Sequence, residues 1–142
     1  MKIAVIDGQG GGIGRLIVEQ LRRALGNNCT ILALGTNALA ASVMLKAGAN
    51  EGASGENAIV FSSSKVDIIT GSVAILAANS YSGELTPRMA EAIASSDAIK
   101  VLIPLNRCGI EICGIIDEPL PWQVENLVER VRYWYQKRLT QE

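Results

Sequence analysis

The sequence contains no histidine and only three cysteines, Cys29, Cys108 and Cys113, among 142 residues. Without histidine, the chain lacks the side chain that most often serves as a general base near neutral pH. An odd number of cysteines without histidine also argues against a disulfide framework and against a zinc site. We therefore expect a cytoplasmic protein with reduced thiols and no metal centre.

The sequence also lacks an excess of charge of either sign, because its 13 Lys and Arg residues nearly balance its 14 Asp and Glu residues. A chain without a basic field is not expected to bind nucleic acid or an anionic membrane. No apolar run approaches about eighteen residues, so a membrane-spanning helix is not expected. The hydrophobic content of 49% predicts a single domain over residues 1–142 with apolar surface to spare. We expect that surplus to cover an interface in a homo-oligomer.

Glycine is abundant, and five glycines stand within the seven residues Gly8–Gly14. This run follows an apolar strand, Lys2–Ile6, and precedes an apolar helix that starts near Arg15. Glycines at a strand end let the backbone approach a ligand, and the following helix directs unpaired N–H groups at it. The pattern predicts a phosphate-binding turn, with a purely structural turn as the alternative. The predicted ligand-binding residues of the turn are Gly8, Gln9, Gly10, Gly11, Gly12, Ile13 and Gly14.

The glycine spacing narrows the choice of phosphate loop. It does not fit G-x-G-x-x-G, because Ile13 stands at the last glycine position. It does not fit the loop of nucleotide triphosphatases either, because Arg15-Leu16 replace the required Lys-Ser/Thr. The spacing G-x-x-x-G-I-G, on Gly8, Gly12 and Gly14, resembles the loop of short-chain dehydrogenases and reductases. That resemblance implies NAD(P) or another nucleotide as cofactor.

The catalytic pair of those enzymes, Tyr-x-x-x-Lys, has only a coincidental counterpart in this chain. Tyr133 and Lys137 have the spacing, but they lie on the last predicted helix with no strand after them. Leu120 stands where those enzymes carry a serine. A reductase is therefore an alternative only if another subunit supplies the base.

The apolar segments predict a three-layer, Rossmann-like α/β fold. A helix over 15–25 and a strand over Cys29–Leu34 complete a β-α-β unit, which is right-handed in nearly every known case. We expect a parallel sheet of order 3-2-1-4, with an antiparallel edge strand 5 over Ile110–Ile116, which follows too closely for a crossover helix. Residues 52–57 are expected to be a loop. The remaining expected strands are Val66–Thr70 and Lys100–Leu105. The expected helices are Ala38–Ala47, Ala58–Phe61, Val73–Ala78, Pro87–Ser95 and Pro121–Leu139, with a strand as the alternative for Val73–Ala78. We expect Ala38–Ala47 to pack against the sheet on one side and against a second subunit on the other.

Ligands of open parallel sheets bind beyond the carboxyl ends of the strands, where the strand order reverses. Thr36 and Asn37 follow the second strand, where a ribose usually meets an acid. Their neutral side chains suit a ribose hydroxyl or a 2′-phosphate equally well, and both residues also suit a helix cap. The other loops at this edge are Gly71–Ser72, Asn79–Ser82 and Asn106–Arg107, and the candidate binding residues among them are Gly71, Ser72 and Asn106.

Two charged side chains stand close to these loops. Asp7 ends the first strand, where it either binds a metal or hydroxyl or accepts backbone N–H bonds and fixes the turn. Arg107 either clamps a phosphate or lies in solvent.

Four segments of the chain, Val5–Gly14, Ala33–Ala38, Gly55–Ala58 and Ile103–Asn106, are similar to those of a family of short bacterial proteins with no assigned function. The resemblance implies a small Rossmann-like domain in which Asn37, Glu56, Asn57 and Asn106 converge on the glycine loop. It names no substrate. We therefore predict a protein that binds a small phosphate ligand, a nucleotide or dinucleotide, with sensing as one role open to it. The alternative is an interaction module whose glycine turn is only structural.

Overall fold

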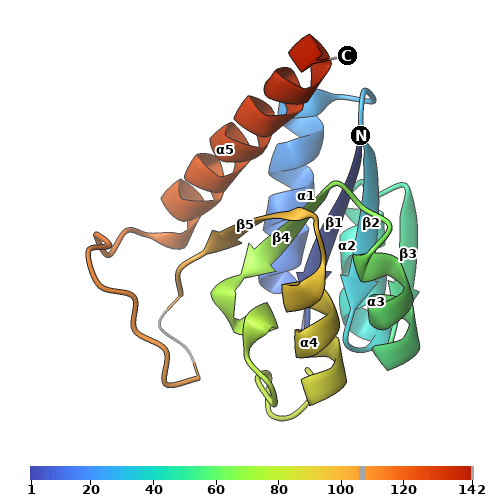
Figure 1. Cartoon of the computed structure of the whole chain (residues 1–142), viewed down its shortest axis with the longest axis vertical. Helices are drawn as coiled ribbons and strands as arrows, with labels where there is room; N and C mark the ends of the chain where they lie inside the picture. Colours follow the sequence, from blue (N-terminus) through green and yellow to red (C-terminus); the bar gives the residue numbers. More distant parts are fainter. Residues whose placement is uncertain (106–107, 142) are drawn as a thin grey trace.

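The computed structural model describes residues 1–105 and 108–141 and shows a five-stranded sheet flanked by helices (Figure 1). Every neighbouring pair of strands is parallel, in the order β3-β2-β1-β4-β5. The predicted α/β architecture with a parallel sheet is therefore confirmed. The strands are β1 (Lys2–Asp7), β2 (Thr30–Gly35), β3 (Glu51–Ser54), β4 (Ile68–Ser72) and β5 (Ile99–Ile103), and the helices are α1 (Gly12–Leu25), α2 (Ala38–Lys46), α3 (Glu56–Ser63), the 3₁₀ turn η1 (Val73–Leu76), α4 (Pro87–Ser95) and α5 (Leu120–Gln141).

The sheet is buried on both faces, because alternate residues of its central strands enter two separate cores. Ile3 and Val5 of β1 pack with α1, α2 and α5 on one face. Ala4 and Ile6 pack with α3, η1 and α4 on the other face. A continuous apolar strand is the pattern expected of such a two-sided parallel sheet. The chain thus folds into three layers, with helices on both sides.

The expected strand positions need a correction at β3. Glu51–Ser54, predicted to be mostly loop, pairs with β2 from Leu32 to Gly35. The strand expected over Val66–Thr70, placed beyond the second strand, is β4 and pairs with β1 instead. β3 is short, mostly exposed and without β-branched or aromatic residues, so its sequence has no strand pattern. The ladder to β2 stabilises it as a strand.

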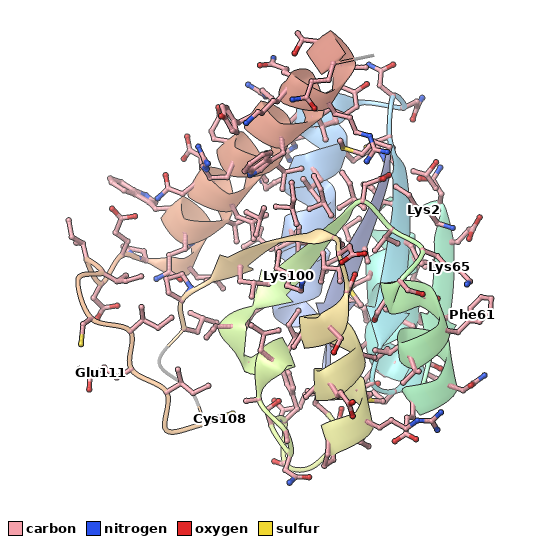
Figure 2. The ribbon with its side chains drawn as sticks, in the orientation of Figure 1. Lys2, Phe61, Lys65, Lys100, Cys108 and Glu111 are labelled. Carbon is pink, nitrogen blue, oxygen red and sulfur yellow. The ribbon has the colours of Figure 1, made fainter. Side chains whose placement is uncertain are left out.

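The antiparallel edge strand expected over Ile110–Ile116 was a wrong prediction. The edge of the sheet is β5, which is parallel to β4 and ends directly before Pro104. Residues 108–119 contain no strand, and positive φ angles at Cys108, Gly109 and Gly114 interrupt extended backbone. Figure 2 shows Cys108 and Glu111 on this segment, away from the sheet.

The observed helices agree with the predicted helices more closely than the strands do. Thr86 caps α4 with its side chain, and Pro87 occupies the first turn, as predicted. The alanine-rich α2 is buried on one side only, since Leu39 is 61% exposed. The other side, where we expect a second subunit to pack, is open in this single chain, and the subunit contact stays a prediction. Among the described residues, no helix is long and apolar enough to cross a membrane.

Candidate functional site

The glycine loop lies at the carboxyl edge of the sheet, between the end of β1 and the start of α1. From β1 the chain crosses through α1 to β2 on one side, whereas it returns through α3 to β4 on the other side. The strand order therefore reverses at β1, and the loop occupies this reversal. Crevices at such positions are the usual ligand sites of open parallel sheets.

Asp7 fixes the loop from the end of β1. Its Oδ1 accepts the Gly8 N–H at 2.8 Å, and its Oδ2 accepts the Gly14 N–H at 2.7 Å. The side chain is buried, at 3% exposure. These bonds match the reading in which Asp7 holds the backbone. Among the described residues, no group of three or more His, Cys, Asp or Glu side chains could hold a metal ion.

The glycines of the loop divide into two kinds. A Cβ atom on Gly8 would lie 2.7 Å from Thr36 Oγ1 and 3.0 Å from Tyr81 Cγ, and Gly11 has a φ of +72° that side chains disfavour. These two glycines are needed for packing and for the turn. A Cβ atom on Gly10 or Gly12 would meet no heavy atom of the described residues within 4 Å. Packing alone therefore does not account for the whole glycine run.

Three backbone amides of the loop remain available as donors. The Gly11 N–H donates to the Gly8 carbonyl, and α1 has neither a side-chain N-cap nor an acid in its first turn. The amides of Gly10, Gly12 and Ile13 donate to no atom of the described residues. Unpaired N–H groups at a helix N-terminus favour a bound anion.

Glu84 joins the glycine loop to the end of β2. Its Oε1 accepts the Thr36 hydroxyl at 2.6 Å, the Asn37 amide group at 2.8 Å and the Gln9 backbone N–H at 2.9 Å. Hydrogen bonds to a carboxylate favour its charged form. The Thr36 hydroxyl first, and then the Gln9 and Asn37 donors, hold the pKa of Glu84 below its ordinary value of 4.5.

This depressed pKa predicts a pH-dependent contribution to stability. A carboxyl whose folded-state pKa is lowered stabilises the fold above its unfolded pKa, and this stabilisation is lost as the pH falls through the folded pKa. We expect the urea midpoint of the wild type to fall more than that of Glu84→Gln between about pH 6 and about pH 3. Equal falls in the two proteins would contradict a charged, bonded Glu84.

The segment that carries Glu84 has a strained backbone. Asn79, Tyr81 and Ser82 have φ angles of 67°, 56° and 58°, and Gln9 across the crevice has 50°. Of the five non-glycine residues with positive φ in residues 1–105 and 108–141, these are four. Such outliers cluster at functional sites in proteins. Tyr81 is 7% exposed and packs its ring where Gly8 leaves space.

The structure brings some of the other predicted residues to the loop. Asn37 both caps α2, through the Ala40 N–H at 2.8 Å, and donates to the Gln9 carbonyl at 3.0 Å. Gly71 and Ser72 are buried in β4: a Cβ atom on Gly71 would lie 2.7 Å from the Ile6 carbonyl oxygen, and Ser72 Oγ caps η1. Whether they bind a ligand stays a prediction.

The remaining predicted residues lie elsewhere. Glu56 begins α3 and contacts Arg88 at 3.5 Å, and Asn57 is exposed beside it. Neither has a hydrogen bond to the glycine loop within the described residues. Asn106 and Arg107 lie outside the described residues.

Sequence reasoning missed Glu84. It included Asn79–Ser82 among the loops expected at the carboxyl edge of the sheet and stopped two residues before Glu84. The signal that could have identified Glu84 is its position in the sequence, because it is a carboxylate two residues before Thr86, the N-cap of α4. Placing Val66–Thr70 beside β1 would have brought this connection next to the glycine loop.

Other reactive groups lie away from the crevice. Lys137 lines a cavity with Met1, Asp67 and Ile99. Each of these three residues precedes or begins a strand, so the cavity lies at the amino edge of the sheet. The Tyr133/Lys137 pair of α5 therefore lies at this edge and not at the carboxyl edge with the glycine loop. The start of β1 and the end of α5 lie near the amino edge (Figure 1). Burial raises the pKa of the Cys29 thiol, which therefore is not a poised nucleophile.

The comparisons with known proteins give one family match. No curated protein matches this chain, and no solved structure matches it. One family model, described as "Domain of unknown function (DUF3842)", matches residues 2–136. The matched region includes the glycine loop, Asp7, the Glu84 segment and most of α5. The chain therefore belongs to the DUF3842 family.

Proposed function

We propose that this protein binds a nucleotide whose phosphate accepts hydrogen bonds from the amides of Gly10, Gly12 and Ile13. The observation that carries the proposal is that these three amides have no hydrogen-bond partner in the described residues, at the start of a 14-residue helix. Exposed amides at a helix N-terminus, together with the helix dipole, suit an anionic group. The open space beside Gly10 and Gly12 leaves room for it.

The position of the loop supports a nucleotide rather than a simple anion. A parallel sheet that places a glycine loop at the reversal of strand order is Rossmann-like, and such crevices bind nucleotides in many proteins. Residues with strained, positive φ angles also lie around this crevice: they are Gln9, Asn79, Tyr81 and Ser82. Fold likeness alone does not define an activity, so we propose binding and assign no reaction.

Electrostatics favour a ligand of modest charge. Asp7 and Glu84 place two carboxyl groups next to the loop. Arg15 and Arg88, two cations near this edge, pair with Glu19 and Glu56. A triphosphate concentrates negative charge that these carboxylates would repel, whereas a bridging diphosphate spreads less charge over two groups. We therefore propose a dinucleotide such as NAD(P), or a nucleoside monophosphate, as the ligand class.

A second candidate function is assembly with another protein chain. On α2, Leu39 and Leu45 are 61% and 43% exposed, and Phe61 on α3 points outward beside Lys65 (Figure 2). Both helices contact β3, which is the edge strand opposite β5. This surface suits the predicted homo-oligomer.

Gly12→Val tests the binding proposal. The valine side chain would enter the space in front of the three amides of the loop. No atom of residues 1–105 or 108–141 lies within 4 Å of its Cβ position, so the fold should tolerate it. NAD and AMP should raise the melting temperature of the wild type, by the equivalent of about 2.7 kcal/mol at about 100 times the Kd. We expect Gly12→Val to show no such rise.

Ala38→Val is the matched control, because Ala38 opens α2 as Gly12 opens α1 and is exposed at the same edge. It should keep the ligand-induced rise. If neither nucleotide shifts the wild type, the binding proposal fails and assembly becomes the favoured function. If Gly12→Val keeps the full rise, the nucleotide lies elsewhere.

A further inference from the structure

We propose that Glu84 recognises the ribose of the bound nucleotide by accepting hydrogen bonds from its 2′- and 3′-hydroxyls, and that it excludes ligands with a 2′-phosphate. This inference rests on the proposed nucleotide site and specifies the ligand class. It resolves the choice that Thr36 and Asn37 leave open, since their neutral side chains suit either group.

The first argument is the place of the carboxylate. In dinucleotide-binding folds, an acid at the end of the second strand accepts from the ribose hydroxyls. Here β2 ends at Gly35 and offers no acid, but Thr36 and Asn37 directly after it bind the Glu84 carboxylate at 2.6 and 2.8 Å. The acid therefore reaches the same position from the connection between η1 and α4.

The second argument is how the two carboxylate oxygens are used. All three protein donors, from Gln9, Thr36 and Asn37, meet Oε1. Oε2 accepts from no atom of the described residues. Oε1 thus orients the group, and Oε2 is available to a ligand. Hydroxyls are donors and match this acceptor, whereas a phosphate has only acceptor oxygens and negative charge there.

The third argument is that no positively charged side chain of the described residues is bonded at the position that a 2′-phosphate would occupy. Sites that accept this group place an arginine near it. Among the described residues, no Lys or Arg forms an ion pair with Glu84 or a side-chain hydrogen bond to Thr36, Asn37 or the glycine loop.

The fourth argument is that the backbone carrying Glu84 is held rigidly. Leu85, next to Glu84, is fully buried, and its N–H donates to the Ser80 carbonyl while its carbonyl accepts the Asn79 N–H at 2.7 Å. Ser80 is itself buried and bonded to the Ala74 carbonyl at 2.6 Å. The carboxylate is thus held before any ligand arrives, which lowers the ordering cost of binding.

Titration calorimetry with NAD and with NADP tests the proposal, because the two differ only by the 2′-phosphate. We expect the wild type to bind NAD at least about tenfold more tightly than NADP, the scale of one hydrogen bond to a charged group. Glu84→Gln should reduce this preference to about twofold or less, mainly through tighter NADP binding, since the repulsive charge is gone.

Glu56→Gln is the matched control: it also replaces a carboxylate at the carboxyl edge, but one that contacts Arg88 and not the loop. It should keep the wild-type preference. A merely loosened loop would weaken both ligands and leave their ratio unchanged, which would overturn the ribose role of Glu84. Equal binding of NAD and NADP by the wild type would overturn it too, while leaving the nucleotide site standing. If neither ligand binds, the ribose role of Glu84 in a dinucleotide fails, and the nucleotide site fails with it only if AMP also gives no rise in the melting temperature.

Discussion

Asp7→Ala is expected to lower the free energy of unfolding by about 3–5 kcal/mol, because two buried N–H groups lose a charged acceptor together. The amides of Gly8 and Gly14 lie 2.8 and 2.7 Å from the carboxylate oxygens, and both bonds are buried. Gly14 is in the first turn of α1, so the loss also removes the acceptor that holds the helix to β1. Urea unfolding followed by circular dichroism measures the change.

Two further variants test whether the loss of stability is specific to the two hydrogen bonds of Asp7. Asp97→Ala removes an exposed carboxylate before β5 and should change stability by no more than about 0.5 kcal/mol. Asp7→Asn keeps one acceptor oxygen, so it should fall between the wild type and Asp7→Ala. A loss below about 1 kcal/mol for Asp7→Ala would show that the loop keeps its shape without the carboxylate.

Gly35→Ala is expected to destabilise the protein by about 2–3 kcal/mol through steric conflict alone. A Cβ atom on Gly35 would lie 2.5 Å from the Asn37 carbonyl oxygen and 2.6 Å from the Ala41 nitrogen. Both atoms belong to the backbone at the start of α2, so neither can rotate away. The start of α2 must shift, and with it Asn37, which bonds Gln9 and Glu84. We therefore also expect weaker nucleotide binding.

Gly52→Ala is the control for this variant. Gly52 lies on the neighbouring strand β3, and a Cβ atom there would meet its nearest atoms at 3.6 Å, an ordinary contact. Alanine also restricts the unfolded chain more than glycine does, so this variant should be neutral or more stable by up to about 1 kcal/mol. Similar losses in both variants would contradict the steric explanation of Gly35.

The crevice combines two opposing features. Three amides at the start of α1 attract an anion, while Asp7 and Glu84 hold negative charge beside them. The carboxylates saturate the donors that shape the loop and leave the outward donors to a ligand. This arrangement favours a ligand that brings hydroxyl groups as well as phosphate, as a nucleotide does.

Much of the fold was readable from local patterns. The apolar runs of β1, β2, β4 and β5 are long enough to mark strands of a parallel sheet. The Thr86-Pro87 pair marked the start of α4 to the residue. The glycine run after β1 placed the candidate site, since it combines strand, turn and helix signals within a few residues.

Two elements could not be predicted in this way. β3 is a strand because β2 offers it an open edge, and its own four residues have no apolar pattern. The segment Ile110–Ile116 has an apolar, strand-like composition, yet positive φ angles just before it at Gly109 and within it at Gly114 interrupt extended backbone, and it pairs with no strand of the described residues. In both cases pairing with a neighbour, and not propensity, decided the structure.

The sequence by itself determined a parallel α/β sheet with a glycine turn at the end of its first strand, because apolar periodicity and glycine conformation are local properties. Only the tertiary structure decided what surrounds that turn. Glu84 lies 75 residues from Gln9 in the chain, and the two meet because β4 pairs with β1. Long-range pairing of strands thus converts a local turn into a crevice with a fixed carboxylate and three free amides.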